Sequence, residues 1–258
     1  MNEPIPVPKV ALVTGAARRI GAIIAVDLAA QGWTVAVHYH GAKDAADGVV
    51  DTIRSRGGTA QAFAADFHDE AEVRRLSGDV RAAFGPFDLL VNNASVFRRD
   101  SILDHSRALW DSHMAVNLRA PLVLTEDLVR HLPEDGRGNV VNILDQRVWN
   151  PTPHFMSYTV SRAGLWTLTQ TLALSLAPRI RVNAIGPGPT LRTEGQSAEH
   201  FARQCRSVPL ERQTQPEEIA QAIRFILAAP AMTGQMIALD GGQHLGWAHP
   251  SPTRPDQP

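Results

Sequence analysis

The 258-residue chain lacks the features that would staple it covalently or place it in a membrane. Its single cysteine, Cys205, excludes an internal disulfide and fits a reducing compartment. No run of about 18 apolar residues is present to span a bilayer. The start of the chain, MNEPIPVPKV, has neither the charged nor the apolar region of a signal peptide. We therefore expect a cytoplasmic protein that does not contact membranes.

An excess of charge of either sign is also absent. The 25 Lys and Arg residues balance 26 Asp and Glu residues, which gives a formal net charge of −1. This balance excludes a basic nucleic-acid-binding surface and an acidic solvating tail. What is present is 44% hydrophobic and 20% charged residues, the composition of an ordinary globular chain. No nucleic-acid partner is expected.

Short apolar runs alternate with helical patterns along almost the whole chain. The predicted strands are Val10–Thr14, Thr34–Tyr39, Ala60–Ala65, Leu89–Asn92, Val140–Leu144, Arg181–Ile185 and Met236–Leu239. Most are apolar on both faces, as strands covered by helices on both sides must be. The sequence therefore predicts an α/β fold: a single-domain, Rossmann-type, doubly wound parallel sheet of about seven strands with helices on both faces.

Two helices stand out between these strands. The first carries isoleucines and a leucine at helical spacing from Ile20 to Leu28, followed by Gly32 as a C-cap. The second covers Glu217–Ala229, with Pro216 at its start.

The expected domain covers residues 9–245. An extension of residues 1–8 precedes it, and a Pro-rich tail of residues 246–258 follows; the tail cannot add a helix or a central strand. Residues 187–212 interrupt the alternation and are interpreted as a mobile insertion, with a substrate loop at about 189–212.

A glycine-containing turn joins the first strand to the first helix. It runs from Thr14 through Gly15 to Gly21. Glycines at such a turn let the backbone approach a pyrophosphate, which then lies at the positive end of the helix. The turn therefore predicts a dinucleotide site.

The end of the second strand indicates NADP(H) rather than NAD(H). A carboxylate there would bind the ribose hydroxyls of NAD and repel a 2′-phosphate. The sequence instead has His38-Tyr39-His40, with no acid before Asp44, and Arg18 supplies a cation. The two histidines could also be metal ligands, but without a third ligand no metal is predicted.

The sequence resembles the short-chain dehydrogenase/reductase family over nearly all of residues 9–245. The matching pieces are the glycine turn, Asn92-Asn93-Ala94, Asn117, Tyr158, Pro187-Gly188 and Leu239-Asp240-Gly241-Gly242. The resemblance implies that Asp66 contacts adenine, that Asn93 lies along the cofactor and that Pro187-Gly188 flanks the nicotinamide. It also implies a homotetramer of twofold symmetry.

With the turn and the second strand, the resemblance gives a full set of expected cofactor-binding residues. They are Gly15, Arg18, Arg19, Ile20, Gly21, His38, Tyr39, His40, Asp66, Phe67, Asn93, Ala94, Ser95, Tyr158, Arg162, Pro187 and Gly188.

Tyr158 and Arg162 are four residues apart, so on a helix they share one face. A nearby cation favours the phenolate of a catalytic tyrosine and brings its pKa toward the working range. In the family that cation is a lysine, whereas this chain has an arginine, which keeps the charge. The resemblance implies that Tyr158, Arg162 and Asn117 are catalytic.

Asp145 stands where the family usually has a catalytic serine, thirteen positions before the tyrosine. A carboxylate would repel the negative oxygen that develops when a simple ketone is reduced. It suits a substrate with N–H donors, such as a pterin, and could help to protonate a ring nitrogen. Asp145 is therefore expected to be catalytic and to manage protons together with Tyr158. The alternative is a helix-capping or ion-paired aspartate at a strand end.

Three further features resemble the pteridine reductases of this family. They are Arg19 in place of a glycine in the turn, His38-Tyr39-His40, and Ser95 with Phe97 after Asn-Asn-Ala. The resemblance implies that Phe97 stacks on the pterin ring and that Ser95 contacts both ligands. It also implies that Arg19 reaches the cofactor phosphates and the substrate edge.

The expected substrate-binding residues are Arg19, Ser95, Phe97, Asp145 and Tyr158. The expected function is NADPH-dependent reduction of dihydropterin or dihydrofolate to the tetrahydro form. Two alternatives stay open: a short-chain reductase of another carbonyl or imine, and an NADPH-binding protein of low turnover because Arg162 replaces the lysine.

Overall fold

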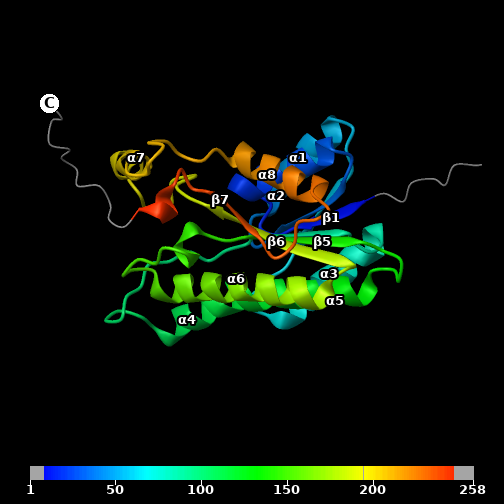
Figure 1. Cartoon of the computed structure of the whole chain (residues 1–258). Coiled ribbons are helices and arrows are strands. Elements are labelled where there is room, and N and C mark those ends of the chain that lie inside the picture. The colour runs from blue at the N-terminus through cyan, green and yellow to red at the C-terminus, as the bar shows by residue number, and fades with distance from the viewer. Residues whose placement is uncertain (1–8, 194, 247–258) are drawn as a thin grey trace, which may run out of the picture.

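The computed structural model describes residues 9–193 and 195–246, and its centre is one parallel sheet of seven strands (Figure 1). The strand order is β3-β2-β1-β4-β5-β6-β7. The strands are β1 Val10–Val13, β2 Thr34–Tyr39, β3 Ala60–Ala64, β4 Leu89–Asn92, β5 Gly138–Ile143, β6 Ile180–Pro187 and β7 Met236–Leu239. All seven predicted strands are present with small differences at their ends, and the predicted fold class is confirmed.

Helices cover both faces of the sheet (Figure 1). One face carries α1 Arg19–Ala30, α2 Lys43–Ser55 and α8 Pro216–Ala228. The other side carries α3 Glu70–Phe84, α4 Arg107–Met114, α5 Ala120–His131 and α6 Met156–Leu176. The chain winds in opposite directions from β1 and from β4, so the carboxyl ends of these neighbouring strands form a crevice where ligands bind in folds of this kind.

The central strands are buried because helices from both sides pack on them. On β1, Val13 belongs to the apolar cluster of Ile24 in α1 and Ile223 in α8, while Leu12 faces the cluster of Leu76 in α3. Each such fully buried aliphatic side chain stabilises the fold by about 1.5–3 kcal/mol. The packing of helices on both faces therefore holds the carboxyl ends of the central strands, which carry the site, in place.

Both helices singled out in the sequence are confirmed. α1 ends at Ala30, and Gly32 follows in a left-handed conformation at φ 85°. α8 begins at Pro216, where Gln215 and Glu218 form a reciprocal capping box.

The segment predicted as a mobile insertion contains a helix that the sequence analysis did not predict, α7 Ala198–Arg206. Ser197 caps the helix by accepting a hydrogen bond from the His200 amide, and Cys205 is buried on its inner side. The apolar face is too short to show in the sequence pattern. Residues 1–8 and the tail from residue 247 lie outside the described residues. Within the described part, no helix is long and apolar enough to cross a bilayer.

Candidate active site

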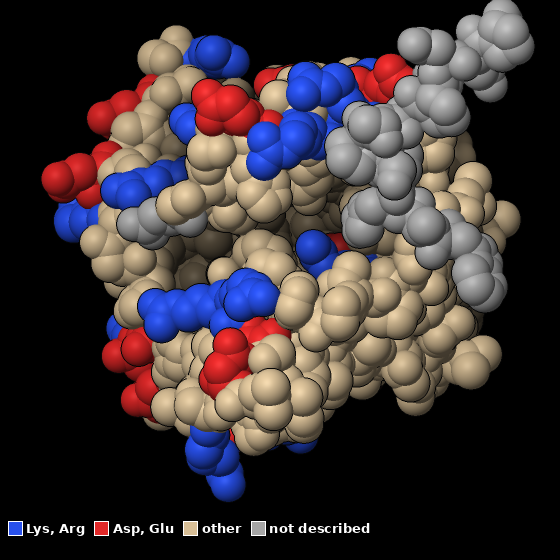
Figure 2. Space-filling view, turned by 90° about the vertical axis from the view of Figure 1, so that its left-hand side faces the viewer, with Lys and Arg blue, Asp and Glu red and all other residues tan. Residues whose placement is uncertain are grey.

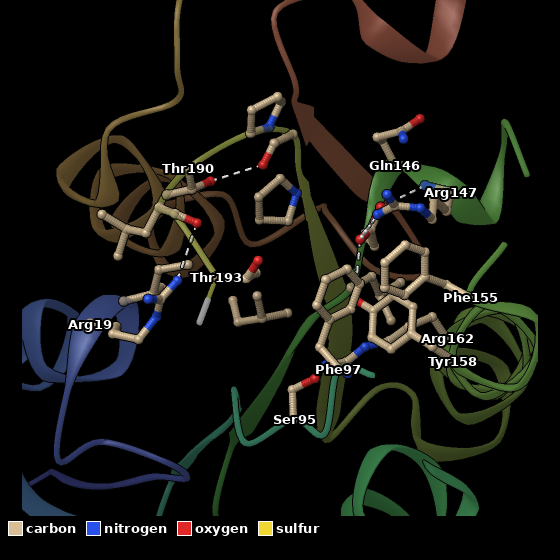
Figure 3. Close-up of a pocket in the computed structure, with 18 of the residues that line it drawn as sticks. Arg19, Ser95, Phe97, Gln146, Arg147, Phe155, Tyr158, Arg162, Thr190 and Thr193 are labelled. Atoms are coloured by element: carbon tan, nitrogen blue, oxygen red, sulfur yellow. Dashed lines mark hydrogen bonds and ion pairs between the residues drawn. The ribbon is translucent and has the colours of Figure 1, made fainter. Parts of the chain in front are cut away.

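A cleft of about 2120 Å³ opens at the carboxyl ends of the central strands. Its walls come from the glycine turn after β1, the loops after β4, β5 and β6, and α7. Figure 2 shows it as a hollow in one face of the molecule. Figure 3 shows Phe97, Phe155, Arg147 and Tyr158 gathered on one side of the pocket and Arg19 on the opposite side.

The glycine turn can be built only with glycine at two positions. Gly15 has a φ of 61°, and a Cβ there would lie 2.9 Å from the Cα of Ala94. A Cβ on Gly21 would lie 2.3 Å from the Gly15 carbonyl oxygen. The backbone is therefore open on its ligand side, as a bound pyrophosphate requires.

Asn93 and Thr14 hold this turn against the end of β4. The Asn93 side-chain amide donates to the carbonyls of Thr14 at 2.8 Å and Gly15 at 3.1 Å. In return, the Thr14 hydroxyl accepts from the amides of Asn93 at 2.9 Å and Ala94 at 3.0 Å. Asn93 thus fixes the shape of the turn and also lines the cleft.

His38, in β2, holds the glycine turn in place through its ring. Its Nδ1 accepts the Gly15 amide at 3.0 Å, so Nε2 carries the proton and donates to the Ala65 carbonyl at 3.1 Å. The ring stacks on Phe67 with 4.1 Å between centroids. Burial lowers the pKa of His38 to about 4, so the ring is neutral at physiological pH. Both ring nitrogens are occupied by backbone groups, which assigns His38 a supporting role rather than metal ligation.

The residues of the turn fit the phosphates of a dinucleotide. The first turn of α1 contains no acidic residue, and its N-cap residue Arg18 makes no side-chain cap, so the amides at this helix end are open to an anion. Arg18 and His40 line the same end of the cleft, where β2 ends without a carboxylate. Asp66 also lies there, and its carboxylate accepts the backbone amide of His68 at 2.9 Å.

Tyr158 and Asp145 meet at the centre of the cleft. Asp145 follows β5, and Tyr158 lies in the first turn of α6. The Tyr158 hydroxyl donates to Asp145 Oδ2 at 3.1 Å. Arg147 pairs with the same oxygen at 2.9 Å, and its amide donates to Oδ1 at 2.9 Å. These contacts link an acid, a phenol and a guanidinium.

Both interpretations of Asp145 apply: it is a capping, ion-paired residue and also a carboxylate of the cleft. It caps a short 3₁₀ turn, Gln146–Val148, and is ion-paired, yet its carboxylate also lines the cleft beside Tyr158. A carboxylate has about four acceptor sites, and three of them are used by Arg147 and Tyr158. One acceptor direction is left for an N–H group of a ligand.

The pKa of Tyr158 moves in the opposite direction to the one expected. Burial, followed by the charge of Asp145, raises it to about 12, and Arg162 offsets only part of this rise. The hydroxyl is therefore protonated and can act as a proton donor. The expectation that the cation would bring the pKa toward neutrality is corrected because burial and Asp145 outweigh the guanidinium.

Arg162 lies under the tyrosine ring. Its guanidinium carbon is 5.4 Å from the Tyr158 ring centroid, and the side chain is buried. Its Nε has no hydrogen-bond partner within the described residues. A buried, unpartnered donor that lines the cleft fits the hydroxyl groups of a cofactor ribose.

An aromatic wall lies beside this centre. The rings of Phe97 and Phe155 stack with 4.5 Å between centroids and a 7° interplanar angle, and Phe97 meets Tyr158 edge to face at 4.6 Å. The Arg147 guanidinium lies 5.2 Å from the Phe155 centroid and 5.6 Å from that of Phe97. One face of Phe97 is thus covered by Phe155, and the predicted stacking on a ligand would use the other face.

A buried chain of hydrogen bonds ties this wall to α6. The Arg98 amide donates to His113 Nε2 at 3.3 Å, and His113 Nδ1 donates to the Ser157 hydroxyl at 2.7 Å. The Ser157 hydroxyl in turn donates to Asp100 Oδ2, at 2.5 Å. Burial lowers the pKa of His113, which fits the neutral ring that this order of donors requires. The network fixes the loop that carries Phe97 relative to Tyr158.

Two residues expected in the site, Asn117 as a catalytic residue and Tyr39 as a cofactor-binding one, do not line the cleft. Asn117 lies in a π-helical turn, Ala115–Arg119, and its side-chain amide is used by both backbone groups of Val96 and by the Ser161 hydroxyl. It therefore braces the loop after β4 instead of contacting a substrate. Tyr39 packs against the apolar core under α1 and α2.

The Arg19 side chain reaches across the cleft and binds backbone carbonyls on its other side. Its guanidinium donates to the carbonyls of Leu191 at 3.2 Å and Arg192 at 2.7 Å, in the segment after β6 (Figure 3). Its φ of 57° is the conformation that glycine adopts freely at this position. Arg19 thereby joins the dinucleotide turn to the predicted substrate loop.

The remaining expected residues line this one cleft. They are Gly15, Arg18, Arg19, Ile20, Gly21, His38, His40, Asp66, Phe67, Asn93, Ala94, Ser95, Phe97, Asp145, Tyr158, Arg162, Pro187 and Gly188. The sequence analysis missed Arg147 and Phe155, which complete the ion pair and the aromatic wall. The available signal was proximity: Arg147 is two residues after Asp145, and Phe155 is three before Tyr158.

Comparisons with known proteins match almost the whole chain. The family model described as "Enoyl-(Acyl carrier protein) reductase" matches residues 15–244. A 3-oxoacyl-[acyl-carrier-protein] reductase of Synechocystis is 36% identical over 91% of this chain and 96% of the relative. Glucose 1-dehydrogenase 2 of Bacillus subtilis is 32% identical over 92% of this chain and 95% of its own length.

Similar solved structures include two with higher identity. FolM alternative dihydrofolate reductase 1 from Brucella canis, complexed with NADP, is 47% identical with a TM-score of 0.91, over 96% of this chain and 98% of that one. The corresponding Brucella suis protein, also with NADP, is 49% identical with a TM-score of 0.90, over 94% and 97%.

Proposed function

The chain belongs to the short-chain dehydrogenase/reductase family, and on that premise we propose that it is an NADPH-dependent reductase of pteridines. The observation that carries the proposal is the carboxylate of Asp145 at 3.1 Å from the Tyr158 hydroxyl. Near this hydroxyl a ketone substrate would develop negative charge, which a carboxylate repels. A dihydropteridine instead presents N–H donors and an imine nitrogen that must gain a proton.

Several features support NADP(H) as the cofactor. The glycine turn, the open start of α1 and the unpartnered Arg162 Nε fit a dinucleotide. β2 is followed by His40 and not by the acid that would disfavour a 2′-phosphate, and Arg18 of the glycine turn lines the same cleft. The Brucella structures that share up to 49% of its residues are complexes with NADP.

The residues of the cleft divide the chemical work. When bound, the reduced cofactor supplies a hydride to the ring carbon next to the imine nitrogen. Tyr158, kept protonated by burial, donates its hydroxyl proton to that nitrogen, so that C=N becomes CH–NH. Arg162 beneath the ring offsets the charge that this leaves on the phenol oxygen.

Asp145 orients the substrate and does not donate the proton. Its remaining acceptor direction can receive an N–H of the heterocycle, while Arg147 holds the carboxylate in place from the opposite side. The free face of Phe97 offers a flat surface for the ring. These groups would hold the substrate against the cofactor, so that binding and protonation occur at one place.

Reduction of a 3-oxoacyl thioester is the second candidate, because relatives with 32–36% identity carry that activity in their names. A panel of substrates separates the two. With NADPH, the pteridine proposal predicts cofactor oxidation with dihydrobiopterin and dihydrofolate and little with 3-oxoacyl thioesters. Turnover of thioesters alone would reject it, and tight NADPH binding without turnover of any substrate would support the low-turnover alternative.

A further inference from the structure

Arginine is concentrated at the cleft although the whole chain is nearly neutral. Among the described lining residues, the carboxylates are Asp66, Asp145 and Glu211. The arginines outnumber them: Arg18, Arg19, Arg99, Arg147, Arg162, Arg203 and Arg206. A cleft with this surplus attracts anions.

Four of these arginines belong to parts of the site already described. Arg18 and Arg19 belong to the dinucleotide turn, and Arg147 and Arg162 accompany Asp145 and Tyr158. The cofactor and the reaction centre account for them.

The other three arginines lie on opposite walls of the opening, and we call them the rim arginines. Arg99 is in the loop between β4 and α4, and Arg203 and Arg206 are on α7. All three side chains are exposed. Arg99 contacts the His154 ring at 3.2 Å. Arg99 and Arg203 also act electrostatically on the carboxylates of Asp104 and Glu199, which are exposed as well. Figure 2 shows Lys and Arg side chains on both margins of the hollow.

We infer that the rim arginines bind the carboxylates of an anionic substrate tail, so that the enzyme selects glutamate-conjugated dihydropteridines, of the dihydrofolate type, over unconjugated ones. The inference rests on the proposed function and names the substrate class for the same site. The heterocycle is held deep in the cleft by Asp145 and Phe97, and a tail attached to it leads outward past the rim. The planar guanidinium group can form two parallel hydrogen bonds to a carboxylate, which gives such pairs geometric specificity.

Kinetics with two substrates test the inference. Neutralising the rim in the triple variant Arg99→Gln, Arg203→Gln, Arg206→Gln should raise the KM for dihydrofolate at least about eightfold, since each of the three exposed pairs contributes roughly two- to fivefold. The ratio of kcat/KM for dihydrofolate to that for dihydrobiopterin should fall by a similar factor. Arg137→Gln, at the opposite end of β5 and outside the cleft, is the matched control and should change neither value.

Tail length and salt give independent readouts on the wild-type enzyme. The KM should fall as glutamate residues are added to dihydropteroate, and the advantage of the conjugated substrates should shrink as salt is raised from about 50 to 500 mM. A triple variant that keeps the wild-type selectivity ratio overturns the inference while leaving pteridine reduction intact. If the wild type reduces neither pteridine, the proposed function itself fails. Rim-dependent turnover of a carrier-protein thioester would assign the arginines to an acidic protein partner and also overturn the inference.

Discussion

Arg147 forms an ion pair with Asp145 at 2.9 Å, on the carboxylate oxygen that also accepts the Tyr158 hydroxyl. Both charged side chains are mostly buried, with 15% and 14% of their surface exposed. Removing one partner of such a pair leaves the other charge poorly solvated. The ion pair therefore sets both the position of the carboxylate and the stability of this part of the cleft.

A double-mutant cycle on this pair should show strong coupling. Arg147→Gln and Asp145→Asn should each destabilise the protein, and the double variant should be more stable than the sum of the two changes predicts. The expected coupling is about 1–3 kcal/mol, measured by denaturant unfolding at neutral pH. Additive effects would mean that the two groups do not interact in solution.

The protonation of Tyr158 can be measured directly because the chain contains only two tyrosines. In a Tyr39→Phe variant, ultraviolet absorbance reports tyrosinate at Tyr158 alone. A pKa of about 12 means that the proton stays on well above the usual range, so no tyrosinate should form up to about pH 10.5. Tyrosinate at pH 8–9 in the free enzyme would contradict the role of Tyr158 as a proton donor.

Arg162 should act through its charge. Arg162→Met should lower kcat/KM about 100-fold and weaken NADPH binding, because it removes the cation beneath Tyr158 and the donor for the ribose. Arg162→Lys restores the charge and should lie within about tenfold of the wild type. Steady-state kinetics and a fluorescence titration with NADPH measure the two effects. A methionine variant with wild-type turnover would remove Arg162 from the site.

His38 makes stability depend on pH. Its pKa is about 4 in the folded protein and about 6.5 in the unfolded chain, so the unfolded state takes up a proton first as the pH falls. Its stabilising contribution is complete above pH 6.5 and is lost between pH 6.5 and 4, by about 3 kcal/mol in total.

The His38→Gln variant isolates this effect. Glutamine does not titrate, and its side-chain carbonyl oxygen can still accept a hydrogen bond from the Gly15 amide. Denaturant unfolding at pH 7, 5.5 and 4.5 should show a smaller loss of stability for the variant than for the wild type. Equal losses would assign the acid sensitivity to other groups, such as His113.

The fold could be predicted from the sequence because its signals are local. Each strand is a short apolar run, and α8 carries Pro216 at its first position. α7 was missed because a nine-residue polar helix depends on packing, here of Cys205, more than on its own periodicity.

The site could be predicted only where it follows from spacing along the chain. Tyr158, Asp145 and the glycine turn have fixed positions relative to the strands. The pairing of Asp145 with Arg147, the stacking of Phe155 on Phe97 and the upward shift in the pKa of Tyr158 depend on distances and burial that the fold creates. Asn117 and Tyr39 were placed in the site because the sequence does not show which side of a strand or helix faces the cleft.

The most direct test of the account replaces Asp145 by serine and compares substrates. For the wild type and Asp145→Ser, kcat/KM would be measured with NADPH for dihydrobiopterin and for a simple ketone. The account predicts that the variant loses at least about 100-fold toward the pteridine, while activity toward the ketone is equal or higher, since the repelling charge is gone. Undiminished pteridine reduction by Asp145→Ser would contradict it.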